Sequence, residues 1–223
     1  CVPSKALIRS ARFVAQTRRA EEFGLGPLEP RVDFARVMRR VREVVREVEP
    51  HDSVERYTGL GVECLQGQAR ITSPYTVEVG GRTLTSRHIV IASGARPLVP
   101  PIPGLDALDY LTSDNLWELN QLPPRLLVLG GGPIGCELAQ SFARLGSRVI
   151  LVEMAPRLMI REDPELAELV ARRFRDEGID LRLGHKAARF EGEEGGPSCR
   201  APVRPLTVPG SPCRASAVFL MRF

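Results

Sequence analysis

The 223-residue sequence predicts an α/β fold with a doubly wound parallel sheet and a small antiparallel sheet. Two observations carry this prediction. Between Arg125 and Leu183, short apolar runs alternate with segments of helical period, which is typical of a parallel sheet with right-handed crossovers. Between Val62 and Ile91, short β-rich runs are separated by turn residues, which is typical of antiparallel strands.

The amino-terminal half begins with two helices. We predict helix at residues 3–20 and at residues 33–49, where an apolar stripe opposes an arginine-rich face, as on a solvated amphipathic helix. Gly80-Gly81 predicts a hairpin turn, and His88–Ala92 is apolar enough to be a buried strand. The predicted strands of this region are 62–65, 69–72, 76–79 and 83–91.

The carboxy-terminal half contains the repeated strand and helix pattern. Its predicted elements are a short helix to Leu119, strand 125–129, helix 134–145, strand 148–152, helix 163–177 and strand 179–183. Gly146 marks the end of the second of these helices. After Phe190 no period is visible, and five prolines lie in residues 197–223. We therefore expect residues 191–223 to be disordered or foreign to the fold.

Composition and charge exclude several classes of protein. No apolar run reaches the roughly 18 residues of a membrane helix, so we expect no membrane segment. The net charge of +4 equals the four arginines of residues 198–223, which contain no acidic residue (4 − 4 = 0 for the rest), and aromatic residues make up only 5%. We therefore expect no nucleic-acid partner. Five cysteines without metal-site spacing indicate reduced thiols, a cytoplasmic location and no metal site.

A glycine-rich turn follows the strand at 125–129. Gly130, Gly132 and Gly135 have the GxGxxG spacing and open a helix, and Glu153 ends the next strand, 153 − 130 = 23 residues later. In this context the first glycine makes the tight turn, the second admits a pyrophosphate and the third lets the helix pack closely. The pattern predicts an NAD site; the alternative is a strand-to-helix turn without a ligand. Glu153 favours NAD over NADP, while Arg157 offers a positive charge to a 2′-phosphate.

Three segments resemble the pyridine nucleotide-disulfide oxidoreductase family, particularly its mercuric reductase and dihydrolipoamide dehydrogenase members. Cys1-Val2-Pro3-Ser4-Lys5 resembles the second half of the CxxxxCxPSK redox motif, Ile91–Pro97 resembles the ATGxxP segment, and Gly130–Glu137 resembles the NAD motif. The resemblance implies a Rossmann-type NAD-binding domain inserted in a partial FAD-binding domain. The implied limits are 1–111 for the partial FAD-binding domain, 112–190 for an incomplete NAD-binding domain and 191–223 for a disordered or non-family tail.

The resemblance also implies roles for single residues. Cys1 matches the flavin-proximal redox cysteine, Lys5 matches the lysine near flavin N5, and Glu137 matches the acid that pairs with this lysine, so these three are the candidate catalytic residues. Lys5, Ala69, Ser93 and Gly94 match positions that contact FAD. The implied NAD contacts are Gly130, Gly132, Pro133, Ile134, Gly135 and Glu153.

The implied activity is that of an FAD-dependent oxidoreductase. It passes electrons from NAD(P)H through flavin and a cysteine pair to a disulfide, a metal ion or a similar acceptor, and the parent protein is expected to be a homodimer. The partner cysteine and the FAD-binding GxGxxG that should precede Cys1 are not in the sequence, so we expect a truncated, impaired form. Two alternatives remain open: a non-catalytic truncated product, and a simple NAD-binding dehydrogenase without flavin.

Overall fold

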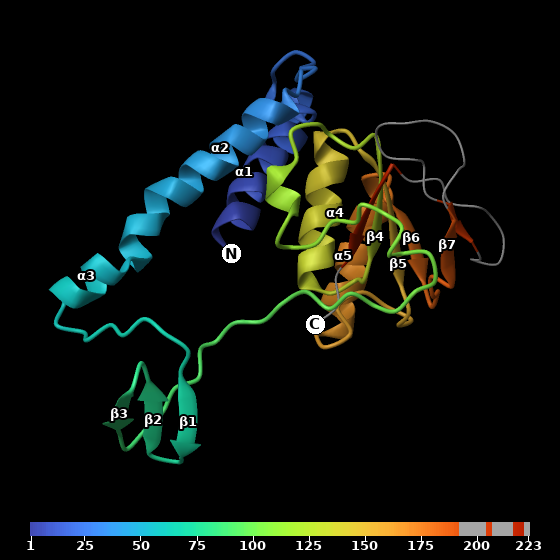
Figure 1. The fold of residues 1–223 in the computed structure, drawn as a ribbon. Helices are drawn as coiled ribbons and strands as arrows, with labels where there is room; N and C mark the ends of the chain where they lie inside the picture. Colours follow the sequence, from blue (N-terminus) through green and yellow to red (C-terminus); the bar gives the residue numbers. More distant parts are fainter. Residues whose placement is uncertain (192–203, 207–215, 221–223) are drawn as a thin grey trace. The chain divides into compact units, whose positions relative to one another are not determined.

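The computed structural model describes residues 1–191, 204–206 and 216–220 (Figure 1). It divides into two units, the first made of Cys1–Val44 with Pro97–Phe223 and the second of Val45–Arg96. The limits inferred above, 1–111, 112–190 and 191–223, follow the resemblance to a family rather than the contacts, and they stay a prediction.

The first unit is built around a four-stranded parallel sheet with the strand order β6-β5-β4-β9. Its strands are β4 (Arg125–Leu129), β5 (Arg148–Glu153), β6 (Asp180–Leu183) and β9 (Ala217–Leu220). Leu126, Leu127 and Val128 are at most 1% exposed, because a central parallel strand is covered on both faces. The α/β class with a parallel sheet is confirmed.

The helices α4 (Pro133–Leu145) and α5 (Pro164–Asp176) connect β4 to β5 and β5 to β6. Both lie on one face of the sheet, since both right-handed crossovers step in the same direction along it. On that face, Val128 shares a core cluster with residues of all four long helices. On the other face, Leu127 packs in a second cluster with Leu105 and Phe190.

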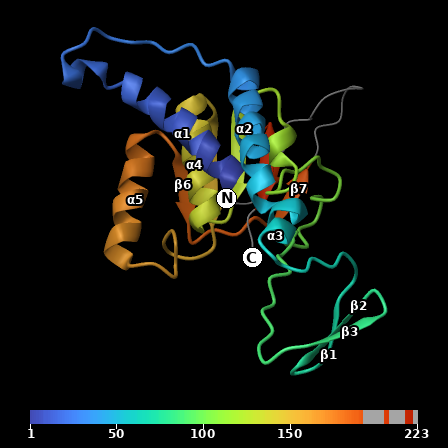
Figure 2. The same ribbon diagram turned by 90° about the vertical axis from the view of Figure 1, so that its left-hand side faces the viewer.

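The helices α1 (Val2–Thr17) and α2 (Phe34–Val48) complete the helical layer. Both views show α1 beside α4 (Figures 1 and 2). One face of α2 is buried through Phe34, Met38 and Val41, and Phe34 lies against Phe142 of α4 with their ring centroids 5.8 Å apart. The amphipathic pattern of α2 thus marks a helix with one face in the core and the other in solvent.

Strand β9 lies within the segment that we expected to be disordered or foreign to the fold. The structure instead pairs Ala217–Leu220 with β4 in parallel, and all four residues are at most 7% exposed. Leu111 N–H also donates to the Val218 carbonyl at 2.7 Å. A short, continuous apolar run is the usual pattern of a buried parallel strand, but here the surrounding prolines and arginines obscured it. The rest of the expected tail lies outside the described residues, apart from Glu191, residues 204–206 and Ser216.

The second unit contains the small antiparallel sheet, in the order β1-β2-β3. Its strands are β1 (Arg70–Ser73), β2 (Thr76–Val79) and β3 (Arg82–Thr85). The hairpin turn has positive φ angles at Gly80 (56°) and Gly81 (77°), as its sequence predicts.

Two predictions for this unit are wrong: residues 62–65 form no strand, and the strand predicted at 83–91 ends at Thr85, so that His88–Ala92 has no strand structure. Val90 and Ile91 are 87% and 71% exposed. A strand exists only where another strand pairs with its backbone, and no described residue pairs with this apolar segment.

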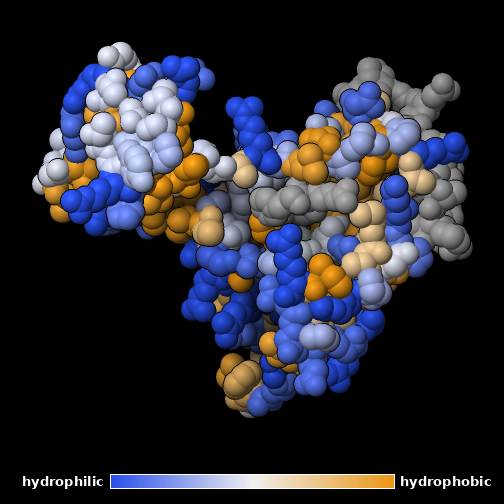
Figure 3. All heavy atoms as spheres, turned by 90° about the horizontal axis from the view of Figure 1, so that it is seen from below, coloured by the Kyte–Doolittle hydropathy of each residue, from blue (hydrophilic) through white to orange (hydrophobic). Residues whose placement is uncertain are grey.

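Apolar side chains occur in small groups among hydrophilic ones on the face shown in Figure 3.

The remaining elements are short. They are the 3-10 helices η1 (Ala20–Phe23), η2 (Glu49–Asp52) and η3 (Leu116–Glu118), the helix α3 (Val54–Gly59), and the antiparallel pair β7 (Arg189–Glu191) and β8 (Arg204–Leu206). None of the helices in the described part of the chain is long and apolar enough to span a membrane.

Candidate functional site

The glycine turn leads from the end of β4 directly into α4. Gly130 has a φ of 109°, which a residue with a side chain rarely adopts, and its N–H donates to the Val152 carbonyl at 2.9 Å. A Cβ on Gly135 would lie 2.1 Å from the Gly130 carbonyl oxygen. The turn therefore depends on glycine at its first position for conformation and at its last position for space.

The middle of the turn is open. A Cβ on Gly132 would have no other heavy atom within 4 Å, although Gly132 is the N-cap residue of α4 and has an ordinary extended backbone. The first hydrogen bond of the helix runs from Cys136 N–H to the Gly132 carbonyl, so the N–H groups of Ile134 and Gly135 precede it. This space beside free helix donors fits a pyrophosphate group, which a side chain at Gly132 would displace.

Glu153 ends β5 and turns its carboxylate towards the glycine turn. Its two oxygens accept hydrogen bonds from Gly131 N–H at 2.6 Å and from Ala155 N–H at 2.7 Å. A carboxylate has about four acceptor positions, so these bonds fix Glu153 and still leave it able to accept from ribose hydroxyls. The predicted turn and the predicted acid are thus parts of one hydrogen-bonded site.

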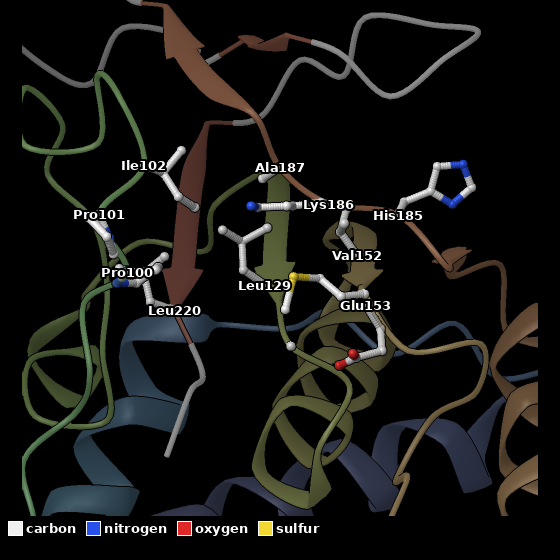
Figure 4. A pocket seen from close by; sticks show the side chains of 12 residues that line it. Pro100, Pro101, Ile102, Leu129, Val152, Glu153, His185, Lys186, Ala187 and Leu220 are labelled. Atoms are coloured by element: carbon white, nitrogen blue, oxygen red, sulfur yellow. The ribbon is translucent and has the colours of Figure 1, made fainter.

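A pocket of about 260 Å³ lies at the carboxyl ends of β4, β5 and β9 (Figure 4). The sheet order changes direction here, since β4 is joined to β5 through α4 whereas β9 lies on its other side, and such switch points hold ligands in α/β sheets. The pocket is mainly apolar. It is lined by Pro100, Pro101, Ile102, Leu129, Gly130, Val152, Glu153, Met154, His185, Lys186, Ala187 and Leu220.

Sequence reasoning assigned only Gly130 and Glu153 of this lining. Figure 4 shows Lys186 extending across Leu129, whereas the His185 ring points away from the other labelled side chains. The ring nitrogen Nδ1 of His185 lies 2.6 Å from the Leu183 carbonyl. Lys186 follows the end of β6 at the same edge of the sheet. Its position just after a predicted strand could have identified it from the sequence as a pocket residue.

The candidate redox residues gather at the starts of two adjacent helices. Cys1 is the exposed N-cap residue of α1, and its carbonyl accepts from Ser4 Oγ at 2.9 Å and Lys5 N–H at 3.1 Å. Lys5 Nζ donates to Glu137 Oε1 of α4 at 2.6 Å. The structure therefore joins Lys5 of α1 to Glu137 of α4 and places Cys1 at the start of α1, and a helix N-terminus is a favourable place for a thiolate.

Cys136 is a structural thiol. It is 5% exposed, and its Sγ donates to the Gly131 carbonyl at 3.4 Å. Burial, and then the charges of Glu153 and Glu137, raise the pKa of this thiol to about 12. A neutral thiol at this place helps to hold the glycine turn and has little nucleophilic character.

The other residues matched to FAD contacts belong to the second unit. Ala69, Ser93 and Gly94 are exposed and lie outside its strands, and Gly94 has a φ of 72°. The structure does not bring them together with Cys1 and Lys5 within one unit. Their matched role therefore stays a prediction. Among the described residues, no group of three or more His, Cys, Asp or Glu side chains is arranged to hold a metal ion.

The fold and the site define a Rossmann-type α/β chain in which α4 begins at a glycine turn and packs against α1, whose N-cap is an exposed cysteine. The family model described as pyridine nucleotide-disulphide oxidoreductase matches residues 1–207. The chain belongs to this family, as its motifs predicted.

Among curated proteins, a mercuric reductase from Streptomyces lividans is 40% identical over 205 residues, which cover 86% of this chain and 42% of the relative. A mercuric reductase from Bacillus cereus is 37% identical, over 86% of this chain and 30% of the relative. A dihydrolipoyl dehydrogenase from Chlorobaculum tepidum is 33% identical, over 95% of this chain and 45% of the relative. The chain thus spans less than half the length of these relatives.

A solved structure gives the same result for the fold. The Cu(II) complex of the HOCl-induced flavoprotein disulfide reductase RclA from Escherichia coli matches with a TM-score of 0.74 and 28% identity. The match covers 99% of this chain and 46% of that chain.

Proposed function

We propose that this chain carries the pyridine-nucleotide site and one redox cysteine of an FAD-dependent oxidoreductase. In this proposal electrons pass from NADH, through flavin and a cysteine pair, to a disulfide, a metal ion or a similar acceptor. The observation that carries the proposal is the 2.6 Å contact between Lys5 and Glu137, because it joins the helix that starts at Cys1 to the helix that starts at the glycine turn. A simple dehydrogenase has no use for this arrangement.

The nucleotide side of the site follows from charge and space. The free N–H groups at the start of α4 would donate to the pyrophosphate, which the open position at Gly132 admits. Glu153 would accept from the ribose hydroxyls, whereas a 2′-phosphate there would meet its negative charge. This supports NADH over NADPH.

The redox side depends on Cys1 and Lys5. Bound FAD supplies the two-electron relay between nicotinamide and thiol. On the protein, the start of α1 favours a thiolate at Cys1, Lys5 contributes a cation, and Glu137 holds this cation in place. For a disulfide acceptor the reaction balances as NADH, a proton and one disulfide giving NAD⁺ and two thiols. The names of the relatives, which include mercuric reductase and flavoprotein disulfide reductase, support a metal ion or a disulfide as the acceptor class.

The nucleotide half of the proposal is tested by titrating the 223-residue chain with NADH and following the fluorescence of the reduced nicotinamide. We expect saturable binding that Gly132→Val reduces at least about tenfold, because the side chain fills the phosphate space and its Cβ has no other heavy atom within 4 Å. Ile71→Val, at an exposed site in the second unit, is the control for changes in measured affinity that do not come from the glycine turn. Equal dissociation constants for the native chain and Gly132→Val would remove the turn from the proposed site.

The redox half is tested by adding FAD and NADH and following the visible absorbance of oxidised flavin without oxygen. We expect NADH-dependent bleaching that slows in Lys5→Ala while NADH affinity is retained, since Lys5 contacts no residue of the glycine turn itself. Arg9→Ala, at an exposed position of the same helix as Lys5, is the control for the loss of one positive charge. Bleaching at the same rate in Lys5→Ala and the native chain would contradict the redox half.

A further inference from the structure

The loop between β5 and α5 is held together by one arginine. Arg157 is half-buried, and its guanidinium donates to three carbonyls of the loop. Its Nη1 donates to the carbonyls of Met159 and Glu162, both at 3.0 Å, and its Nη2 donates to that of Ile160 at 2.7 Å. Three of its donors are therefore committed to the loop backbone, and the guanidinium is not directed at Glu153.

The loop reaches the glycine turn through Met159. This residue is the one non-glycine residue with a positive φ, 43°, in the part of the chain that the structure describes. Its N–H donates to the Gly131 carbonyl at 2.8 Å. A positive φ is unfavourable for methionine, so neighbouring contacts must maintain it, and the bond from Arg157 to the Met159 carbonyl is such a contact.

Both peptide units that meet at Gly131 are consequently held by hydrogen bonds. Its N–H donates to Glu153, and its carbonyl accepts from Met159 N–H and from Cys136 Sγ. A Cβ on Gly131 would lie 2.8 Å from Leu158 Cδ2, so the loop also packs directly on the turn. The orientation of this peptide sets the position of Gly132, which follows it at the open phosphate space.

We propose that Arg157 is a positioning residue of the nucleotide site: it holds Met159 in a conformation that fixes the Gly131 peptide and so keeps the turn open for pyrophosphate. The proposal rests on the proposed function, since it assigns Arg157 to the same site. It replaces the possibility that Arg157 reads a 2′-phosphate. A residue that binds the 2′-phosphate changes the affinity for NADPH alone. A residue that positions the turn changes the affinity for every ligand with a pyrophosphate.

The test compares Arg157→Gln with Arg161→Gln in the 223-residue chain. Arg161 is exposed in the same loop, so its replacement removes an equal charge without changing the carbonyl contacts of Arg157. We expect Arg157→Gln to weaken the binding of NADH and of NADPH by the same factor, about tenfold, because charge-assisted hydrogen bonds are lost. We expect Arg161→Gln to change either affinity less than about twofold.

A second readout needs no ligand. In amide NMR spectra of the unliganded chain, Arg157→Gln should shift the signals of Gly131 and Gly132, while the signals of the second unit stay in place. If the chain binds no NADH, the proposed function fails, but these signals still test the positioning role. If Arg157→Gln does not fold, Arg157→Lys is used, which keeps the charge but not the planar fork, and a smaller shift of the same two signals is expected.

Three outcomes would overturn the inference. The first is a loss of NADPH affinity at least tenfold greater than the loss of NADH affinity, which would make Arg157 a phosphate reader. The second is unchanged Gly131 and Gly132 signals in a folded variant. The third is an equal effect of Arg161→Gln, which would assign the result to charge alone.

Discussion

Adding one methyl group at Gly135 should separate α4 from β4. The new Cβ would lie 2.1 Å from the Gly130 carbonyl oxygen, and an ordinary contact begins at 3.4 Å, so the helix must move by up to 3.4 − 2.1 = 1.3 Å. A gap of about 0.5–1 Å forfeits roughly a quarter to a half of each dispersion contact. The contacts at risk belong to Leu138, Ala139 and Phe142, which are at most 1% exposed. We expect Gly135→Ala to lower the free energy of unfolding by about 2–3 kcal/mol.

Denaturant unfolding followed by circular dichroism measures this loss, and for a chain of this size the same loss lowers Tm by roughly 4–12 °C. The matched control adds the same methyl group at Gly132, where it meets nothing within 4 Å. We expect Gly132→Ala to lower the free energy of unfolding by no more than about 1 kcal/mol, the cost of alanine at an N-cap, yet to weaken NADH binding. A Gly135→Ala chain as stable as the native one would refute the reasoning from close packing.

Three further predictions use other parts of the site and core. Burial raises the pKa of Glu177, but the hydrogen bonds and charges of Arg144 and Arg173 outweigh burial and hold this pKa below its usual value. The stabilising effect of Glu177 should therefore be present at neutral pH and lost as pH falls through the lowered pKa. Denaturation midpoints of the native chain and Glu177→Gln should therefore converge in acid. Glu153→Arg should shift the ratio of NADH to NADPH dissociation constants towards NADPH, and an unchanged ratio would exclude Glu153 as the selecting residue. At mildly alkaline pH, iodoacetamide should modify Cys1 much faster than Cys136 in the native chain, with equal rates only after unfolding; mass spectrometry of peptides distinguishes the two.

The sequence was sufficient for the features that depend on local geometry. The strand before Gly130, the glycine at the end of α4 and the acid at the end of β5 follow from backbone conformation and period. The structure begins α4 at Pro133, one residue before the predicted start at Ile134, and gives Gly146 the positive φ of 118° expected at a helix end. Turn chemistry is local, so it can be inferred from a few adjacent residues.

Features that depend on partners could not be inferred in this way. His88–Ala92 has the composition of a buried strand but has no strand structure, whereas Ala217–Leu220 forms a buried strand within a segment that shows no period. In both cases the outcome depends on whether a neighbouring strand offers hydrogen bonds to the backbone, and composition does not report that. The position of Arg157 was visible in the sequence, but its bonds to three loop carbonyls were not.

The contact between α1, which Cys1 caps, and α4, which starts at the glycine turn, is likewise a tertiary feature. Lys5 and Glu137 are separated by 132 residues, and the spacing of motifs does not predict their contact. Near the other end of the same helix pair, Arg18 donates to the Arg144 carbonyl at 2.9 Å, so α1 and α4 run in the same direction and are tied at both ends. These two hydrogen bonds fix the axial position of one helix relative to the other. Because Cys1 caps the start of α1 and α4 starts at the glycine turn, this register also sets how far the thiol lies from the turn. A change that moves α4, such as a methyl group at Gly135, should therefore disturb both halves of the proposed site.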